Sequence, residues 1–104
     1  MRQNFVVTPE AKASLRDILS DLAEDSPEAA HRLRLRLYEG FQLLGRSPGI
    51  GHFHEELLNR QFRFRNFYPF VVVYAWETSP IQIVSVVHGA RDLATILTLR
   101  DDLD

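Results

Sequence analysis

Residues 70–87 read FVVVYAWETSPIQIVSVV, two apolar runs (70–76 and 81–87) separated by a Ser79-Pro80 turn. Both runs are rich in β-branched and aromatic residues, which favour strands. Residues 60–67, immediately upstream, alternate between aromatic and arginine side chains, and this period of two also predicts a strand. Pro69 separates that strand from the next. Because the turns between the three strands are short, we expect an antiparallel meander.

The N-terminal part predicts a short strand at residues 4–7, followed by two helices. Thr8-Pro9-Glu10 and Ser26-Pro27-Glu28 each combine an N-cap hydroxyl, a proline at the first helical position and an early acid. Apolar residues at helical spacing then predict helices over 9–24 and 27–45. With so short a junction between them, the two helices should form an antiparallel hairpin.

A last helix is predicted after the strands, because Asp92 can cap a segment that carries Leu93, Ile96 and Leu97. The acidic tail, residues 100–104, should be frayed. The element order is then β-α-α-β-β-β-α, an α+β fold in which the helical hairpin packs on one face of an antiparallel sheet. We expect residues 1–104 to form one such domain, since this length suits a single one.

The other face of the sheet is expected to be open. In strand 60–67, Phe62 and Phe64 point to one side, and Arg63 and Arg65 to the other. If the phenylalanines pack beneath the helices, the arginines point toward the open face. Strand 81–87 is apolar at both alternate sets of positions, so its pattern does not assign its faces.

Composition narrows the classes of function. None of the 104 residues is cysteine, which excludes a disulfide framework, a thiolate zinc site and a cysteine nucleophile. The N-terminus lacks the apolar core of a signal peptide, and the longest apolar run, Phe70 to Trp76, is far shorter than the roughly 20 residues that span a bilayer. We therefore expect a cytoplasmic protein without membrane contact. A chain this small closes a modest core, which favours a groove or a face over a deep cavity as its site.

Charge is unevenly distributed along the chain. Residues 31–65 hold seven bases and three acids, whereas residues 1–30 hold three bases and six acids and residues 66–104 two bases and five acids. Eleven of the twelve basic residues are arginine, whose planar fork of donors suits carboxylates, phosphates and aromatic rings. A basic stretch of this kind indicates either a macromolecular contact or a solvated helix face.

Motifs for catalysis on small molecules are missing. Gly49-Ile50-Gly51 lacks the spacing, the following helix and the lysine of a phosphate-binding loop, and no nucleophile elbow is present. His52-Phe53-His54 precedes Glu55-Glu56, but without a further spaced set of ligands these residues are better explained by loop polarity than by a metal. We expect no metal, no cofactor and no small-molecule substrate.

His88 ends the last predicted strand and allows two interpretations. In the structural one, a backbone group satisfies His88, Gly89 relaxes the turn and Asp92 caps the helix that follows. In the functional one, His88 and Arg91 lie beside Arg63 and Arg65 on the open face. Such a cluster could hold a phosphodiester, with His88 moving a proton near neutral pH.

Several of these segments, in this order, resemble the ParE branch of the RelE/ParE toxin superfamily over residues 5–98. The segments are Thr8-Pro9-Glu10-Ala11 before an apolar helix, Leu44-x-x-x-Pro48-Gly49-x-Gly51 after the second helix, the strand pair from Arg60 to Tyr74, and Val86-x-His88-Gly89-Ala90-Arg91-Asp92. Each segment alone is a weak signal. Together with the chain length and the element order they are fairly specific.

The resemblance implies the toxin half of a type II toxin–antitoxin pair, neutralised by direct binding of a cognate ParD-like antitoxin. Toxins of the ParE branch are associated with poisoning DNA gyrase, and those of the RelE branch cleave mRNA on the ribosome. The nuclease branch tends to use several lysines and arginines with a His, Glu or Tyr near the C-terminus. Here Lys12 is the only lysine, and the tail after Arg100 holds no aromatic or basic residue. We therefore favour gyrase and a protein that is not an enzyme.

Two alternatives stay open. One is a metal-independent, ribosome-dependent endoribonuclease that uses Arg63, Arg65, His88 and Arg91. The other is a non-toxic descendant that keeps antitoxin binding. In every case the antitoxin should contact the exposed arginines of the second helix, Arg32, Arg34 and Arg36, because an acidic antitoxin segment would complement them.

Overall fold

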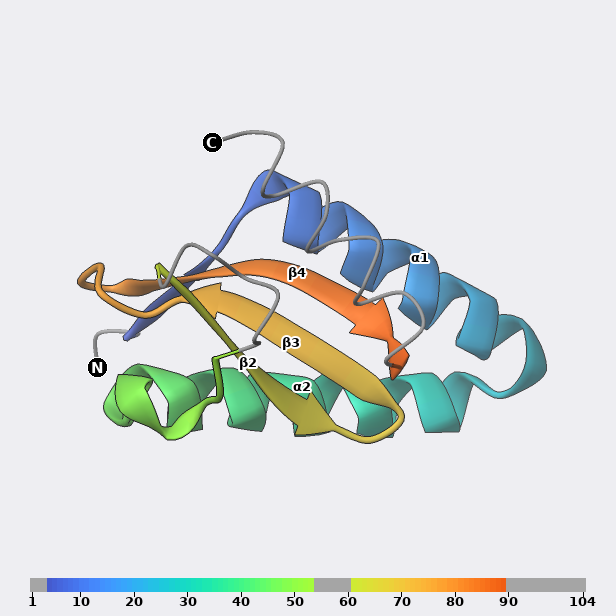
Figure 1. Cartoon of the computed structure of the whole chain (residues 1–104). Coiled ribbons are helices and arrows are strands. Elements are labelled where there is room, and N and C mark those ends of the chain that lie inside the picture. The colour runs from blue at the N-terminus through green and yellow to red at the C-terminus, as the bar shows by residue number, and fades with distance from the viewer. Residues whose placement is uncertain (1–3, 54–60, 90–104) are drawn as a thin grey trace.

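A computed structural model describes residues 4–53 and 61–89 (Figure 1). Its elements follow the predicted order as far as the last strand. The predicted C-terminal helix, with Asp92, Leu93, Ile96 and Leu97, lies outside the described residues. The elements are β1 (Phe5–Val7), α1 (Pro9–Asp25), α2 (Pro27–Arg46), the 3-10 turn η1 (Pro48–Ile50), β2 (Phe62–Phe67), β3 (Phe70–Ala75) and β4 (Ile81–His88).

Both long helices begin where the sequence predicts. The Thr8 hydroxyl accepts a hydrogen bond from the Ala11 N–H at 3.3 Å, and the Ser26 hydroxyl accepts one from the Ala29 N–H at 3.2 Å. Ser26 also closes α1, since its own N–H donates to the Leu22 carbonyl. One residue therefore ends α1 and starts α2, and the chain reverses there (Figure 1).

The sheet is mixed, and the prediction of an antiparallel sheet was wrong for one strand. The strand order is β1-β4-β3-β2, with β2, β3 and β4 antiparallel as predicted and β1 parallel to β4. The helical hairpin carries the chain from one edge of the sheet to the other, so β1 pairs with the last strand of the meander. Two strands joined by such a long connection are free to run parallel.

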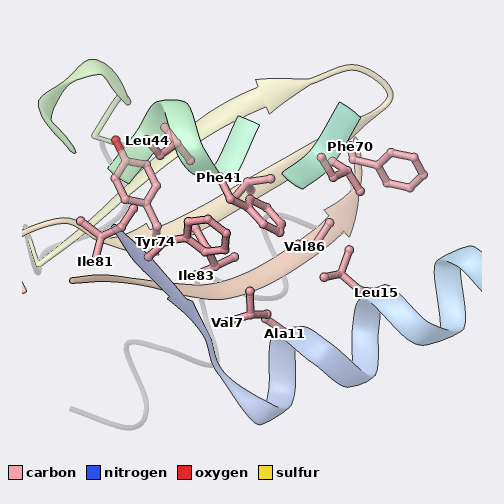
Figure 2. Close-up of a cluster of buried hydrophobic side chains, with 13 residues drawn as sticks. Val7, Ala11, Leu15, Phe41, Leu44, Phe70, Tyr74, Ile81, Ile83 and Val86 are labelled. Atoms are coloured by element: carbon pink, nitrogen blue, oxygen red, sulfur yellow. The ribbon is translucent and has the colours of Figure 1, made fainter. Parts of the chain in front are cut away.

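Apolar side chains lie on both faces of the sheet. The helix face is the side of β3 and β4 that packs with α1 and α2, and Figure 2 shows its cluster, including Phe41, Leu44 and Tyr74. The second face carries a smaller cluster of four buried valines, Val71, Val73, Val84 and Val87. Both faces of β4 are thus apolar, which agrees with a sequence that is apolar at both alternate sets of positions.

A bulge explains why the sequence pattern of β4 does not show which residues lie on which face of the sheet. Val73 pairs with Ser85 and Tyr74 pairs with Ile83, so Val84 has no partner on β3. The extra residue shifts the alternation by one position, which puts Ile83 and Val86 on the same face.

The arginines of β2 lie on the helix face. The open face was expected for them if the phenylalanines of the same strand packed beneath the helices. Phe64 pairs with Val73 and packs with the second face, whereas Arg63 pairs with Tyr74 and Arg65 with Val72, both on the helix face. Since strand alternation has a period of two, the packing of the phenylalanines with the valines turns both arginines toward the helix side.

The edge strand β2 also approaches α2 closely. A Cβ atom built on Gly40 would lie 2.6 Å from the Phe67 ring, so the absence of a side chain at Gly40 lets that ring pack against the helix. Gly40 and Phe67 thereby fix the distance between α2 and the arginine-bearing strand. Neither described helix is long and apolar enough to cross a membrane.

Candidate functional site

The hydroxyl of Tyr74 connects the centre of the sheet to the loop after α2. The Tyr74 hydroxyl donates to the Pro48 carbonyl at 2.6 Å and accepts from the Gly51 N–H at 2.9 Å. The side chain is fully buried, and Figure 2 shows it within the cluster that includes Leu44 and Ile81. A buried hydroxyl needs such partners, and here both come from one loop.

Arg63 holds the same loop from the neighbouring strand. Its Nη1 donates to the Gly51 carbonyl at 2.8 Å. Its Cζ lies 4.0 Å from the ring centroid of Phe53 and 4.0 Å from that of Trp76, so the guanidinium sits in the angle between two edge-packed rings. Its Nε is buried without a hydrogen-bond partner. The guanidinium is thus engaged on several sides by its own chain.

Arg65 makes a weaker contact with the loop. Its Nη1 reaches the Ile50 carbonyl at 3.5 Å, the long limit for a hydrogen bond. Both arginines therefore donate to carbonyls of the turn that ends α2. We name this set, Tyr74, Arg63 and Arg65 with residues 48–53, the loop clamp.

The loop clamp also covers part of the β2 edge. The His52 N–H donates to the Phe64 carbonyl at 2.7 Å, and the Phe64 N–H donates back to the His52 carbonyl at 2.8 Å. His52 therefore pairs with β2 as an isolated antiparallel bridge. This pairing satisfies backbone groups that an edge strand would otherwise present to another chain.

The electrostatics of the loop clamp favour a neutral phenol. Burial raises the pKa of Tyr74 above its usual value of 10.0, and the Gly51 hydrogen bond and the charges of Arg63 and Arg65 lower it by less. Burial prevails because it disfavours the phenolate. Tyr74 is therefore neutral at physiological pH and acts as a hydrogen-bonding strut.

The predicted residues near the C-terminal end of β4 are only partly described. The His88 ring is exposed and packs edge-on against Phe70, with ring centroids 5.2 Å apart at 89°. Gly89 has a φ of +70°, which glycine adopts without strain. Arg91 and Asp92 lie outside the described residues. The φ of Gly89 is one that the predicted turn after His88 could use.

Arg63 and His88, two described members of the alternative nuclease set, lie apart on the sheet. Arg63 pairs with Tyr74, whereas His88 pairs with Phe70 at the other end of β3. Phe70 and Tyr74 are four residues apart along β3, which corresponds to roughly 13 Å. His88 and Arg63 therefore do not form one compact cluster.

The three arginines predicted for the antitoxin are all exposed on α2, but they point in two directions. Arg32 and Arg36 are one turn apart and share a side of the helix. Arg34 lies on another side, where its Cζ is 5.9 Å from the Tyr38 ring centroid. Only Arg32 and Arg36 can contact one narrow partner segment together.

A hollow of about 400 Å³ lies between the start of α1 and the strands, and the part of its lining that the structure describes offers no cation. The described residues of its lining include one acid, Glu10, and no lysine, arginine or histidine; they are Thr8, Pro9, Glu10, Gln61, Phe62, Ala75, Thr78, Gln82 and Val84. Nor do three or more His, Asp or Glu side chains gather as metal ligands within residues 4–53 and 61–89. His54, Glu55 and Glu56 fall outside those ranges.

Sequence reasoning missed two members of the loop clamp, Tyr74 and Phe53, and it also missed Trp76, whose ring packs on Arg63. A signal for Tyr74 was present, because a single hydroxyl in the run FVVVYA must find a partner if the strand is buried. No pattern in the sequence links Arg63 to Phe53 and Trp76, since these contacts depend on the path of the loop.

Replacing Tyr74 by Phe should lower the free energy of unfolding by about 1–3 kcal/mol, because the Gly51 N–H is left buried without an acceptor. Tyr38→Phe is the matched control, since Tyr38 makes no hydrogen bond in the described structure. In the wild type the unfolded phenol ionises first, so stability should fall above pH 10 by roughly 1.4 kcal/mol per unit until the folded pKa is reached. That fall should be smaller in Tyr74→Phe. Equal denaturation curves for Tyr74→Phe and Tyr38→Phe would show that the hydrogen bonds of the Tyr74 hydroxyl do not stabilise the fold.

The chain matches a known protein family over most of its length. A family model for the ParE toxin of the type II toxin–antitoxin system parDE matches residues 5–93. This match confirms the resemblance to the ParE branch. Among curated proteins, none matches the chain. Because the family match spans well over half of the 104 residues, the chain belongs to the ParE toxin family of type II toxin–antitoxin systems.

Proposed function

We propose that this protein is a cytoplasmic toxin that acts on DNA gyrase by direct protein contact and is neutralised by a ParD-like antitoxin. Membership of the ParE family supports the toxin role and the existence of an antitoxin partner in general. The observation that carries the choice of target is the loop clamp, which engages Arg63 and Arg65, two of the three arginines of the nuclease alternative.

The competing proposal is a ribosome-dependent endoribonuclease. It requires Arg63 and Arg65 to meet phosphates, yet Arg63 donates to Gly51 and is enclosed by two aromatic rings. His88, the candidate acid or base, packs on Phe70 at the far end of β3. General acid–base catalysis needs its groups within hydrogen-bond reach of a common substrate atom. The separation of His88 from Arg63 favours a mechanism without a catalytic residue.

The antitoxin contact is proposed on α2. Arg32 and Arg36 are exposed and spaced one turn apart, so an acidic segment can pair with both. Charge complementarity of this kind accelerates association and sets specificity. Arg34 contributes to the same interface only if the segment also reaches the Tyr38 side of the helix.

Reversing both charges in Arg32→Glu/Arg36→Glu should weaken antitoxin binding at least tenfold at low salt, since attraction becomes repulsion at two positions. The fold should be unchanged, because both side chains are exposed. Lys12→Glu/Arg16→Glu is the matched control, with the same charge change at the same spacing on exposed positions of α1. Calorimetric titration of each variant with the antitoxin gives the comparison. If the two double variants bind equally well, the α2 patch is not the interface.

Induction of the protein without its antitoxin should separate the two targets. Gyrase poisoning predicts DNA damage and filamentous cells while protein synthesis initially continues. Pulse labelling of new protein and a DNA-damage reporter, followed together after induction, provide the test. Rapid arrest of translation, with mRNA cut at ribosomal A-site codons, would instead establish the nuclease. If a folded protein that still binds antitoxin causes neither effect, that result would indicate the non-toxic descendant.

A further inference from the structure

The turn between β2 and β3 carries an aromatic side chain that lies almost entirely in solvent. Among the large apolar side chains of the described residues, Tyr68 is the most exposed, at 83%, ahead of Leu35 at 52% and Val6 at 49%. Tyr68 and Pro69 form the turn itself. Single exposed apolar side chains are common on protein surfaces. The surroundings of Tyr68 therefore decide whether its exposure has a meaning.

The turn is held by an anchored aromatic residue on each side. Phe67 and Phe70 pair with each other across the hairpin. The Phe67 ring packs against α2 at Gly40, and both aromatic residues pack in the helix-face cluster. Figure 2 shows Phe70 at one end of this cluster. The backbone of Tyr68 is thus fixed between two anchored residues, while its side chain projects into solvent.

The end of β4 lies beside this turn (Figure 1). The exposed ring of His88 packs edge-on against Phe70, with which His88 also pairs. A Cβ atom built on Gly89 would lie 3.9 Å from the Pro69 carbonyl oxygen. We name residues 66–70, His88 and Gly89 the hairpin tip. None of its residues is an acid, a lysine or an arginine.

We propose that the hairpin tip is the surface with which the toxin grips its target, and that Tyr68 enters an uncharged pocket of gyrase. The inference rests on the proposed function for the identity of the target. Tyrosine is enriched among the few residues that carry most of the binding energy of an interface. Ordering its two side-chain torsions costs little entropy, and a backbone that is already fixed lowers the cost of binding further.

The chemistry of the hairpin tip favours the target over the antitoxin as its partner. The antitoxin is proposed to bring an acidic segment to Arg32 and Arg36, and the tip offers such a segment no lysine or arginine. The two surfaces are neighbours, because Arg32, Arg36 and Gly40 share one side of α2 and Gly40 packs against Phe67. An antitoxin on the arginines would stand beside the tip and exclude a large target without gripping Tyr68.

Tyr68→Ala tests the tip directly, because it removes an exposed ring and opens no cavity. Leu35→Ala is the matched control, since it also truncates an exposed apolar side chain. The probe is purified gyrase, titrated with each toxin variant in the absence of antitoxin. We expect Tyr68→Ala to bind gyrase at least about tenfold more weakly than Leu35→Ala. Tyr68→Phe keeps the ring and should bind more tightly than Tyr68→Ala.

The melting temperature of Tyr68→Ala and its affinity for the antitoxin should equal those of the wild type. The antitoxin probe is the purified product of the small reading frame that adjoins the toxin gene. If the wild type binds gyrase and Tyr68→Ala binds it as tightly as Leu35→Ala, the tip proposal is overturned and the proposed function stands. A tenfold loss of antitoxin affinity in Tyr68→Ala would assign the tip to the antitoxin and would also overturn it. A wild type that does not bind gyrase refutes the proposed function, and the tip proposal with it.

Discussion

The arrangement of this protein depends on one buried hydroxyl. Tyr74 lies on the central strand β3, and its two hydrogen bonds hold Pro48 and Gly51. They fix the direction in which the chain leaves α2, and this direction brings His52 alongside β2 and Phe53 against Arg63. Ile50 of the loop packs against the helix-face cluster and Phe53 packs on Trp76, and the polar contacts of Tyr74 and Arg63 add to this apolar packing.

The loop clamp has a consequence for function, because it divides the basic residues into two groups. Arg63 and Arg65 are directed at loop carbonyls, whereas Arg32 and Arg36 on α2 are exposed. The first group stabilises the fold, and the second is available to a partner. An arginine-rich middle of the chain is thus compatible with a protein that binds another protein and does not bind RNA.

Much of the fold could be predicted from the sequence, since local chemistry determines it. The caps Thr8 and Ser26 with their following prolines fixed the helix starts, and the strands were recognised from their residue types. The faces of the strands could not be predicted, because Val84 forms a bulge that only pairing with β3 reveals. The side of Arg63 could not be predicted either, because the alternation in β2 does not say whether Phe64 packs with the helices or with the valines of the second face. The parallel pairing of β1 and the contacts of Tyr74 depend on residues distant in the chain, and periodicity carries no information about them.

The most direct test of this account is the behaviour of Arg63→Lys, which keeps the positive charge but loses the planar fork that donates to Gly51 and packs on two rings. Thermal unfolding, antitoxin affinity and toxicity should be measured on the same preparation, with Arg34→Lys as the exposed control. If Arg63 has a structural role, Arg63→Lys should have a lower melting temperature, and its loss of toxicity should be no larger than its loss of folded protein. A variant with an unchanged melting temperature and unchanged antitoxin affinity, but without toxicity, would show that Arg63 meets the target and would contradict the account.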